Sequence, residues 1–450
     1  MCSETRPTAK PETVVANARK YSAQIEIEKL MKAILLSLGT RGDIEPFLAI
    51  AEKLHKKGHD VVCAFPVQFK KLVNESKYEF YGLSEKFLEL LEGEKVKIVL
   101  GGKGNVFQKI GALIWMLRTS QAMQKEVITQ QHDLIEEKQP GIVVYNQKCL
   151  YPMIWGIKNP GKTTLLSPLP CTVHETGSHA SLGMGSDLGV TLNKFTYRFS
   201  NFFLFKTILS STKRYHKQLG IKVNYSIIKK HILREEEMIY TISPSLFPKP
   251  SDWPENVHIV GYHEKDVNSD WKPSKKLVDF ISKHDKILFI TFGSMTNPNP
   301  EQKTKEILSV LTKHKIPAII NTASGGLVKV QECPDHVLFL DTIPYGWILP
   351  KMYAAIHHGG SGTLHTALKY GCATMIIPHI LDQHIWNDLL PKLKVGPKGV
   401  SIKKFSIKSF EKGVLDLLHN EKYKENAIAI GNKMQNENYE DYLLKVILKQ

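Results

Sequence analysis

The chain lacks the segments that place a protein in a membrane and the cysteine patterns that hold small folds together. No apolar run reaches the ~18 residues needed to span a bilayer, and residues 1–30 have no apolar core of the kind that a signal peptide carries. Its six cysteines are widely spaced and contain no C-x-x-C pair. We therefore expect reduced, buried thiols and a cytoplasmic protein that is at most peripheral to a membrane.

The sequence also lacks zinc-finger spacing and RNA-binding signatures, although it is strongly basic. The formal net charge is +16 and the isoelectric point is near 9.3. Because the basic residues are scattered, we expect no nucleic-acid partner, and an anionic substrate or weak attraction to an acidic membrane instead. The length of 450 residues predicts two or three domains, at about 150 residues for each.

One stretch near the C-terminal end reads as strand, glycine-rich turn, helix and strand. The apolar run 353–356 leads into the turn 357–362, which is followed by a helical pattern to residue 370 and a β-branched run over 373–378. Backbone N–H groups at such a turn face the ligand at the positive end of the helix dipole. The stretch therefore predicts an anion site, most often one for phosphate.

Two common glycine motifs do not fit this turn. A dinucleotide fingerprint needs a third glycine where His365 stands, and a P-loop needs a lysine that is missing here. Asp382 and Gln383 follow the second strand. We therefore expect a nucleoside-diphosphate donor other than ATP or NAD, with this polar pair reaching the group that the diphosphate carries.

The N-terminal half opens as a β-α-β unit. The buried strand 32–38 is followed by the turn 39–43, a helix over about 44–57 and a second strand at 59–65. Such a unit predicts a doubly wound α/β domain whose ligands bind at the carboxyl ends of the strands. Asp43 stands at such an end.

Further short apolar runs predict the remaining strands: 142–145, 163–166, 238–242, 287–292, 318–321 and 336–340. Residues 168–190 read as a long loop, and the proline-rich residues 243–273 as a domain boundary. The aromatic residues of 195–210 recur at helical spacing. For these, core packing is favoured over an acceptor groove or a membrane-facing helix.

The motifs together resemble the GT-B UDP-glycosyltransferases of glycosyltransferase family 1. The pattern from His358 to Thr363, the strand ending at Pro378 and the pair Asp382-Gln383 look like the donor signature of this family. The segments 39–46 and 243–262 resemble sterol glucosyltransferases, which share the group with bacterial natural-product glycosyltransferases. The resemblance implies an α/β protein with two Rossmann-like, doubly wound domains that face each other across a cleft.

It also implies the division of the chain. We expect a flexible leader over 1–31, an acceptor-binding domain over 32–242, a linker over 243–280, a nucleotide-sugar domain over 281–415 and C-terminal helices over 416–450 that return to the first domain.

The resemblance assigns roles to individual residues. Asp43 is the presumed general base, although Asp is also a preferred N-cap and the same carboxylate could serve only to cap the following helix. The resemblance implies that six residues bind the donor diphosphate: Ser294, His358, Gly360, Ser361, Gly362 and Thr363. For Ser294, phosphate contact and a place lining the cleft stay equally open. Asp382 and Gln383 are the sugar-binding pair, with a plain helix start as the alternative.

Nucleoside and acceptor contacts are less well defined. We expect the nucleoside near Thr342, Ile343 and Trp347. Plant relatives carry a ribose-binding glutamate where Thr366 stands, so ribose recognition is not carried over. Acceptor contacts are assigned to Trp115, His174 and His179, with surface histidines favoured for the last two. His357 is expected to be a core histidine.

The sequence thus predicts an inverting UDP-sugar hexosyltransferase, with glucose favoured, that acts on a hydroxyl of a lipophilic acceptor such as a sterol, polyketide or flavonoid. No Asp-x-Asp occurs, which argues against a metal-bridged diphosphate, so we expect no metal and no cofactor besides the UDP-sugar. Two alternatives stay open. One is a nucleotide-sugar-binding protein without catalysis, and the other is a UDP-sugar epimerase, for which the additional acidic residues are missing.

Overall fold

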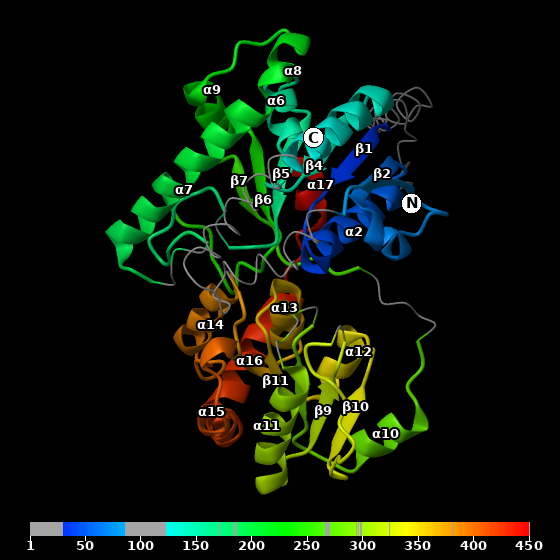
Figure 1. The fold of residues 1–450 in the computed structure, drawn as a ribbon, viewed down its shortest axis with the longest axis vertical. Coiled ribbons are helices and arrows are strands. Elements are labelled where there is room, and N and C mark those ends of the chain that lie inside the picture. Colours follow the sequence, from blue (N-terminus) through cyan, green and yellow to red (C-terminus); the bar gives the residue numbers. More distant parts are fainter. Residues whose placement is uncertain are drawn as a thin grey trace, which may run out of the picture.

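The computed structural model describes residues 30–85, 123–170, 172–182, 184, 187–265, 271–293, 295, 297, 299–323, 325–380 and 382–449. In the described part the chain forms two α/β domains, one above the other in Figure 1. The first seven strands build the upper sheet and the other five build the lower one, and every strand pair in both sheets is parallel. The predicted fold class is confirmed.

The upper sheet has the order β3-β2-β1-β4-β5-β6-β7. Its strands are β1 Lys32–Leu36, β2 Asp60–Pro66, β3 Glu79–Leu83, β4 Ile142–Tyr145, β5 Thr163–Ser167, β6 Glu237–Tyr240 and β7 Val257–Ile259. Its helices are α2 Arg41–Lys56, the helical residues 123–138, α6 Tyr151–Lys158, α7 Val190–Ser211, α8 Lys213–Gln218 and α9 Tyr225–Lys230, with the short turns η1 Val67–Leu72 and η2 His231–Glu235. No strand or helix interrupts the described residues of the loop 168–189, as the sequence predicted.

The lower sheet has the order β10-β9-β8-β11-β12. Its strands are β8 Leu288–Thr291, β9 Ala318–Asn321, β10 Val337–Leu340, β11 Ala354–His357 and β12 Ala373–Ile376. The accompanying helices are α10 Lys275–Ser282, α11 Pro300–Lys313, α12 Tyr345–Ile348, α13 Ser361–Lys369, α14 Asp382–Leu393, α15 Ile407–His419, α16 Glu421–Gln435 and α17 Glu440–Leu448, with η3 Leu349–Lys351 and η4 Ile402–Lys404.

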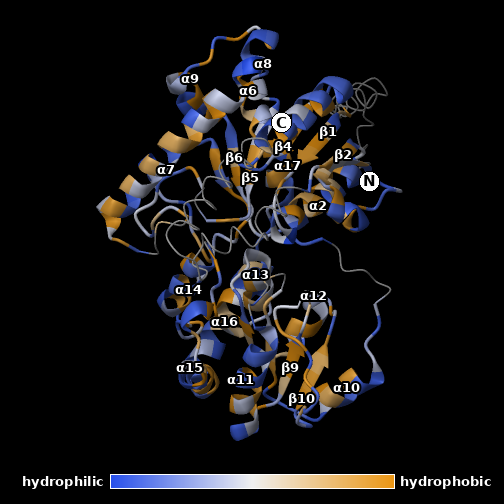
Figure 2. Cartoon of the chain, in the orientation of Figure 1, coloured by the Kyte–Doolittle hydropathy of each residue, from blue (hydrophilic) through white to orange (hydrophobic). Residues whose placement is uncertain are grey.

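Both sheets are covered on their two faces, which explains why their strands are apolar without interruption. Successive residues of β1 alternate between two cores: Ile34 and Leu36 face one, whereas Ala33 and Leu35 face the other. Figure 2 shows apolar strands enclosed by helices that carry both polar and apolar residues. The strands predicted from the apolar runs lie within a few residues of their expected bounds.

The segment 243–280 is more than a connection between the domains. It contributes β7, which pairs with β6 in the upper sheet, and α10, which packs on the lower one. The backbone N–H of Ser243 donates to Nε2 of His365 at 3.0 Å, and the Tyr262 ring stacks on the same imidazole. Since His365 Nδ1 lies 2.7 Å from the carbonyl of Ser361, the segment is fixed against α13.

The C-terminal helices divide between the two domains. Helix α16 packs against α13 and β12 of the lower domain, whereas α17 contacts α2 and β4, and the C-terminus lies beside the upper sheet (Figure 1). Four apolar residues of α17 join the core of the upper domain: Leu443, Leu444, Ile447 and Leu448. The chain therefore crosses between the domains twice.

Two expectations drawn from composition concern thiols and membrane spans. Cys63, Cys149 and Cys372 are free, buried thiols, as predicted, whereas Cys333 is exposed. In the part of the chain that the structure describes, no helix is both long enough and apolar enough to cross a membrane.

Candidate active site

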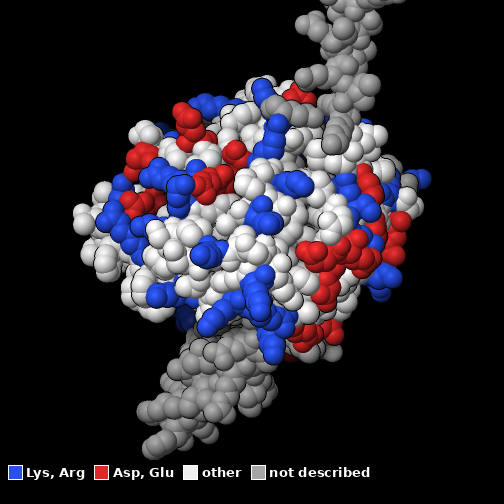
Figure 3. Space-filling view, turned by 90° about the horizontal axis from the view of Figure 1, so that it is seen from above, with Lys and Arg blue, Asp and Glu red and all other residues white. Residues whose placement is uncertain are grey.

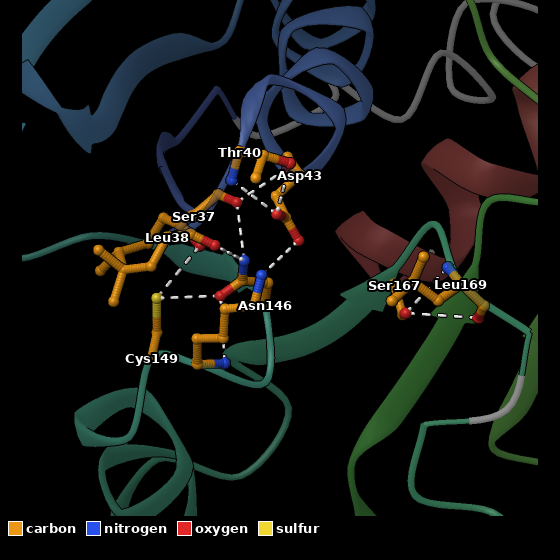
Figure 4. Close-up of polar contacts among 10 residues, drawn as sticks. Ser37, Leu38, Thr40, Asp43, Asn146, Cys149, Ser167 and Leu169 are labelled. Atoms are coloured by element: carbon orange, nitrogen blue, oxygen red, sulfur yellow. Dashed lines mark hydrogen bonds and ion pairs between the residues drawn. The ribbon is translucent and has the colours of Figure 1, made fainter. Parts of the chain in front are cut away.

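Asp43 lies at the point where the strand order of the upper sheet reverses, between β1 and β4. Ligands of open α/β sheets bind outside the carboxyl ends of the strands at such a point. The loop after β1 leads into α2, and the loop after β4 lies beside it because Asn146 donates to Ser37 Oγ at 2.9 Å and to the carbonyl of Leu38 at 2.7 Å (Figure 4). The two loops therefore form one polar site.

The carboxylate of Asp43 has three partners in this site. Oδ2 accepts from the backbone N–H of Thr40 at 2.8 Å and from its hydroxyl at 3.2 Å, and Oδ1 accepts from Lys148 Nζ at 2.7 Å. Helix α2 begins at Arg41, three residues earlier than expected, so Asp43 stands in its first turn and not at the N-cap. Its capping interaction is with the backbone of the N-cap residue Thr40. A carboxylate has about four lone-pair sites, so one remains for an incoming hydroxyl.

Gly39 allows this arrangement. Its φ is +128°, which disfavours any other residue, and a Cβ there would stand 2.2 Å from Asp43 Oδ2 and 2.5 Å from Lys148 Nζ. The glycine of the turn therefore makes room for the carboxylate and the ammonium group together.

Lys148 was not identified from the sequence. It lies 105 residues from Asp43 along the chain, and the residues next to it in the sequence form no motif that predicts a role in a binding site. The available signal was its place just after the predicted strand 142–145, because the carboxyl ends of neighbouring parallel strands meet at one edge of the sheet.

The glycine-rich turn occupies the corresponding point of the lower sheet, where β8 and β11 are neighbours. Helix α13 begins at Ser361 with Gly360 as its N-cap, so its first N–H groups are free to bind an anion. Gly362 and Thr363 complete this first turn, and Thr363 is partly buried. In Figure 1, α13 lies at the edge of the lower domain that faces the upper one.

The imidazole of His358 is enclosed between two glycines. A Cβ on Gly293 would come within 2.8 Å of His358 Cε1, and a Cβ on Gly360 within 2.5 Å of Nε2. Burial, reinforced by His357 and His379, holds the pKa of His358 well below its usual range, so the ring is neutral. Among the described residues its buried Nδ1 has no hydrogen-bond partner. A buried nitrogen left in this way is unfavourable unless a ligand satisfies it.

His357 is buried, as expected of a core histidine. Its Nδ1 accepts from the backbone N–H of Gly359 at 3.0 Å, and burial lowers its pKa to about 3. It therefore supports the shape of the turn from beneath.

A carboxylate reaches α13 from the linker. Glu264 accepts from the hydroxyl of Thr366 at 2.6 Å and from Lys369 Nζ at 2.9 Å. Thr366 stands where plant relatives were expected to carry a glutamate. In this chain a carboxylate from a different part of the sequence, that of Glu264, lies beside the same position. The sequence gave no sign of this, because 102 residues separate the two.

Asp382 and Gln383 begin helix α14, which was the structural alternative for this pair. Gln383 is buried, and its side-chain oxygen accepts from the backbone N–H groups of His379 and Ile380 at 2.7 and 3.1 Å. Asp382 is partly exposed, and its carboxyl group interacts electrostatically with Asp43 and Lys148 of the upper domain. The start of α14 and the site around Asp43 therefore lie close to each other.

This proximity gives a prediction about pH. Although part of the residue reaches solvent, desolvation of its carboxyl group raises the pKa of Asp382 to about 7; the charge of Asp43 adds to the rise, whereas its own backbone N–H and Lys148 oppose it. Below that pH the group is protonated, and above it the carboxylate can accept two hydroxyl hydrogen bonds. If Asp382 binds the sugar donor that the resemblance implies, KM for that donor is expected to fall roughly tenfold as the pH rises from about 6 to about 8.

Steady-state kinetics at several pH values would measure this change. The Asp382→Asn variant cannot titrate and should show a flat profile over the same range. A variant that kept the slope of the wild type would assign the titration to another group.

An apolar cavity of about 270 Å³ adjoins Lys148 in the upper domain. It lies between α7 and the helical residues 123–138, and a lipophilic molecule could occupy it. The lining residues are Leu38, Met123, Gln124, Val127, Ile128, Gln131, Gln147, Lys148, Leu150, Phe203, Leu204 and Thr207.

The expected nucleoside residues lie around α12. Thr342 is exposed, Ile343 is buried, and Trp347 is partly buried with Lys351 Nζ 4.0 Å above its ring. Helix α12 contacts α13, so these residues lie beside the donor turn.

The residues expected to contact the acceptor do not line the apolar cavity in the described part of the chain. His174 and His179 are buried, so their favoured description as surface histidines is wrong. They pack against Trp253 and against Tyr197 and Phe247 respectively, away from the lining of the apolar cavity, and burial lowers the pKa of each to about 4. Trp115 and Ser294 lie outside the described residues.

Family models match both halves of the chain. Residues 33–138 match the N-terminal domain of glycosyltransferase family 28, and residues 305–441 match the C-terminal domain of proteins like erythromycin biosynthesis protein CIII. These segments contain Asp43 and the donor turn respectively.

Relatives and solved structures agree with the models. A sterol 3-beta-glucosyltransferase of Arabidopsis thaliana is 29% identical over 90% of this chain, and one of Yarrowia lipolytica is 26% identical over 90%. The chain spans 63% and 28% of their respective lengths. The calicheamicin glycosyltransferase CalG4 has the same fold, with a TM-score of 0.66 and 15% identity over 94% of this chain and 99% of its own.

A spinosyn rhamnosyltransferase solved with thymidine diphosphate superposes with a TM-score of 0.60 at 14% identity, over 93% of this chain and all of its own. The two domain models, the relatives and the twin parallel sheets lead to one conclusion: the chain has the GT-B glycosyltransferase fold and is similar in sequence to sterol glucosyltransferases.

Proposed function

We propose that this chain transfers a hexose from a UDP-sugar to the hydroxyl group of a lipophilic acceptor, with a sterol as the favoured class. The observation that carries the proposal is the proximity of three features. Lys148 bonds Asp43 and also lines the apolar cavity of the upper domain, and Asp382 at the start of α14 interacts electrostatically with both charged groups. The curated relatives whose names state a sterol substrate favour the same acceptor.

In the proposed reaction the acceptor hydroxyl attacks the anomeric carbon from the side opposite the diphosphate. The bond from that carbon to the diphosphate oxygen breaks, the configuration inverts, and the hydroxyl proton passes to the free lone pair of Asp43. Lys148 and Thr40 hold the carboxylate in place as it accepts the proton.

The leaving diphosphate gains negative charge as the bond breaks. The N–H groups at the start of α13, the hydroxyl groups of Ser361 and Thr363, and the neutral imidazole of His358 would stabilise it. Asp382 would accept hydrogen bonds from hydroxyl groups of the transferred sugar. This scheme assigns no step to a metal ion.

The proposal predicts activity without divalent cations. We expect UDP release from UDP-glucose to rise in the presence of one acceptor from a panel of sterols and phenolics, and to be unchanged within about twofold by excess EDTA. UDP binding is measured separately by calorimetry.

Three results would change the proposal. Loss of turnover in EDTA, with recovery on adding Mg²⁺, would contradict the metal-free scheme. Tight UDP binding without turnover of any acceptor would favour the non-catalytic alternative. Absence of UDP binding would contradict the assignment of the donor turn itself.

A further inference from the structure

The long helix α7 turns four of its aromatic side chains to solvent, whereas Tyr197 and Phe205 are buried. Phe195, Phe199, Phe202 and Phe203 are 60%, 45%, 46% and 53% exposed. The buried face of the same helix is more polar, since it includes Asn193, Thr196 and Asn201. The expectation that the aromatic residues of 195–210 serve mainly in the core is therefore wrong for these four.

These side chains form a continuous surface, which we call the aromatic ridge: Leu192, Phe195, Phe199, Phe202 and Phe203. Neighbouring rings contact one another, with centroids 6.5 Å apart for Phe195 and Phe199, 4.9 Å for Phe199 and Phe203, and 5.4 Å for Phe202 and Phe203. Exposed Leu188 and Val190 extend it at the N-terminal end of the helix. In Figure 2 the apolar colour of α7 reaches the outer edge of the upper domain. Contiguous exposed apolar surface of this kind marks an interaction site.

The sequence around the ridge has an excess of basic residues, although two of them, Lys194 and Arg198, form ion pairs with Asp252 and Glu175 from neighbouring segments. Residues 188–234, which include α7, α8 and α9, contain seven lysines and three arginines and not one Asp or Glu. Lys206 projects beside the ridge, with its Nζ 5.8 Å from the centre of the Phe202 ring. Figure 3 looks down on the upper domain and shows Lys and Arg spread across this face, with groups of Asp and Glu and uncharged surface between them. The segment therefore has a local excess of basic residues within a chain whose basic residues are otherwise scattered.

The aromatic ridge is also continuous with the apolar cavity. Phe203 belongs to both, because it is half exposed and lines the cavity together with Leu204 and Thr207. At its other end the cavity is lined by Lys148, whose ammonium group bonds Asp43. An apolar path therefore leads from the ridge towards the candidate base.

We propose that α7 docks on the surface of an anionic lipid bilayer, with the aromatic ridge in the interface and the basic residues of 188–234 against the lipid headgroups. Exposed aromatic rings flanked by lysine and arginine are the composition of helices that lie in a membrane interface. The excess of lysine and arginine, which remains after the ion pairs of Lys194 and Arg198 are counted, favours an anionic bilayer as the partner. The lipophilic acceptor then enters the cavity at Phe203 directly from the bilayer. The entry of the acceptor rests on the proposed function, whereas the docking itself does not.

Docking is tested by co-sedimentation of the full chain with phosphatidylcholine vesicles, with and without phosphatidylserine. We expect binding to the anionic vesicles that weakens at high salt, and a loss of at least about tenfold in the Phe195→Glu/Phe199→Glu variant. The matched control is Val278→Glu, because Val278 is also about half exposed but lies on α10 of the lower domain. It should bind as the wild type does, and circular dichroism should show that both variants are folded.

Activity separates the two proposals. With acceptor dissolved in cyclodextrin the ridge variant should match the wild type, whereas with acceptor embedded in anionic vesicles it should be at least about tenfold slower. Ridge-dependent vesicle binding without any transfer would leave the docking standing and remove the proposed function. A wild type that ignores anionic vesicles, or a ridge variant that binds them equally well, would overturn the docking. Dimers that dissociate in the ridge variant, without vesicle binding, would overturn it in favour of a second copy of this chain.

Discussion

Replacing Asp43 with Asn is expected to lower kcat for sugar transfer by at least about 10³-fold while UDP binding stays within about twofold of the wild type. The amide has nearly the shape of the carboxylate but cannot take a proton from the acceptor hydroxyl. UDP binding should survive because the donor turn belongs to the other domain. Single-turnover kinetics with a lipophilic acceptor would measure the first quantity, and calorimetry with UDP the second.

The control for this prediction addresses the structural role of the same residue. Asp43 also holds the start of α2 through its bonds to Thr40. Thr40→Ala removes the hydroxyl contact and should cost about 1 kcal/mol of folding stability, with activity reduced by no more than about threefold. If Asp43→Asn reduced activity no more than Thr40→Ala, Asp43 would be a capping residue and another group would have to act as the base.

Replacing His358 with Ala is expected to lower kcat about 10²- to 10³-fold and to weaken UDP binding about tenfold. The reason is that the neutral imidazole is held between Gly293 and Gly360 with a buried nitrogen that lacks a partner among the described residues. A diphosphate that gains charge in the transition state would supply that partner. The effect on kcat should exceed the effect on binding, because the bond strengthens as charge develops.

His357 provides the matched control. In His357→Asn the side-chain oxygen can replace Nδ1 as the acceptor for the N–H of Gly359, so transfer should be nearly unchanged. His358→Gln keeps a hydrogen-bond donor and should recover part of the activity that Ala loses. Equal losses in His357→Asn and His358→Ala would show that the shape of the turn matters and not the imidazole of His358.

The sequence predicted the strands and the position of the glycine-rich turn well because their signals are local. A buried parallel strand is a short run of apolar residues. The turn from His357 to Thr363 is also contiguous, because the end of the strand, the glycines and the start of the helix follow one another directly in the sequence. The family resemblance rested on the same contiguous pieces, and the family models match the segments that contain them. Twin parallel sheets then follow from the order of the elements.

Errors arose where burial depends on distant neighbours. The exposure of the phenylalanines of α7 and the burial of His174 and His179 cannot be read from spacing, because an aromatic face at helical period fits a core and a docking surface equally well. The start of α2 was misplaced because Thr40 and Asp43 both have capping side chains.

The sequence by itself determined two parallel α/β sheets, the position of the glycine-rich turn before α13 and the presence of a carboxylate beyond the first strand. Only the tertiary structure decided what surrounds these groups. It placed Lys148 on Asp43 across 105 residues, Glu264 on Thr366 across 102, and Asp382 of one domain near Asp43 of the other. The physical reason is that the hydrogen bonds of a helix and hydrophobic periodicity involve residues close together in the sequence. The electrostatics of a site depend instead on distant segments of the chain that meet at the edges of two sheets.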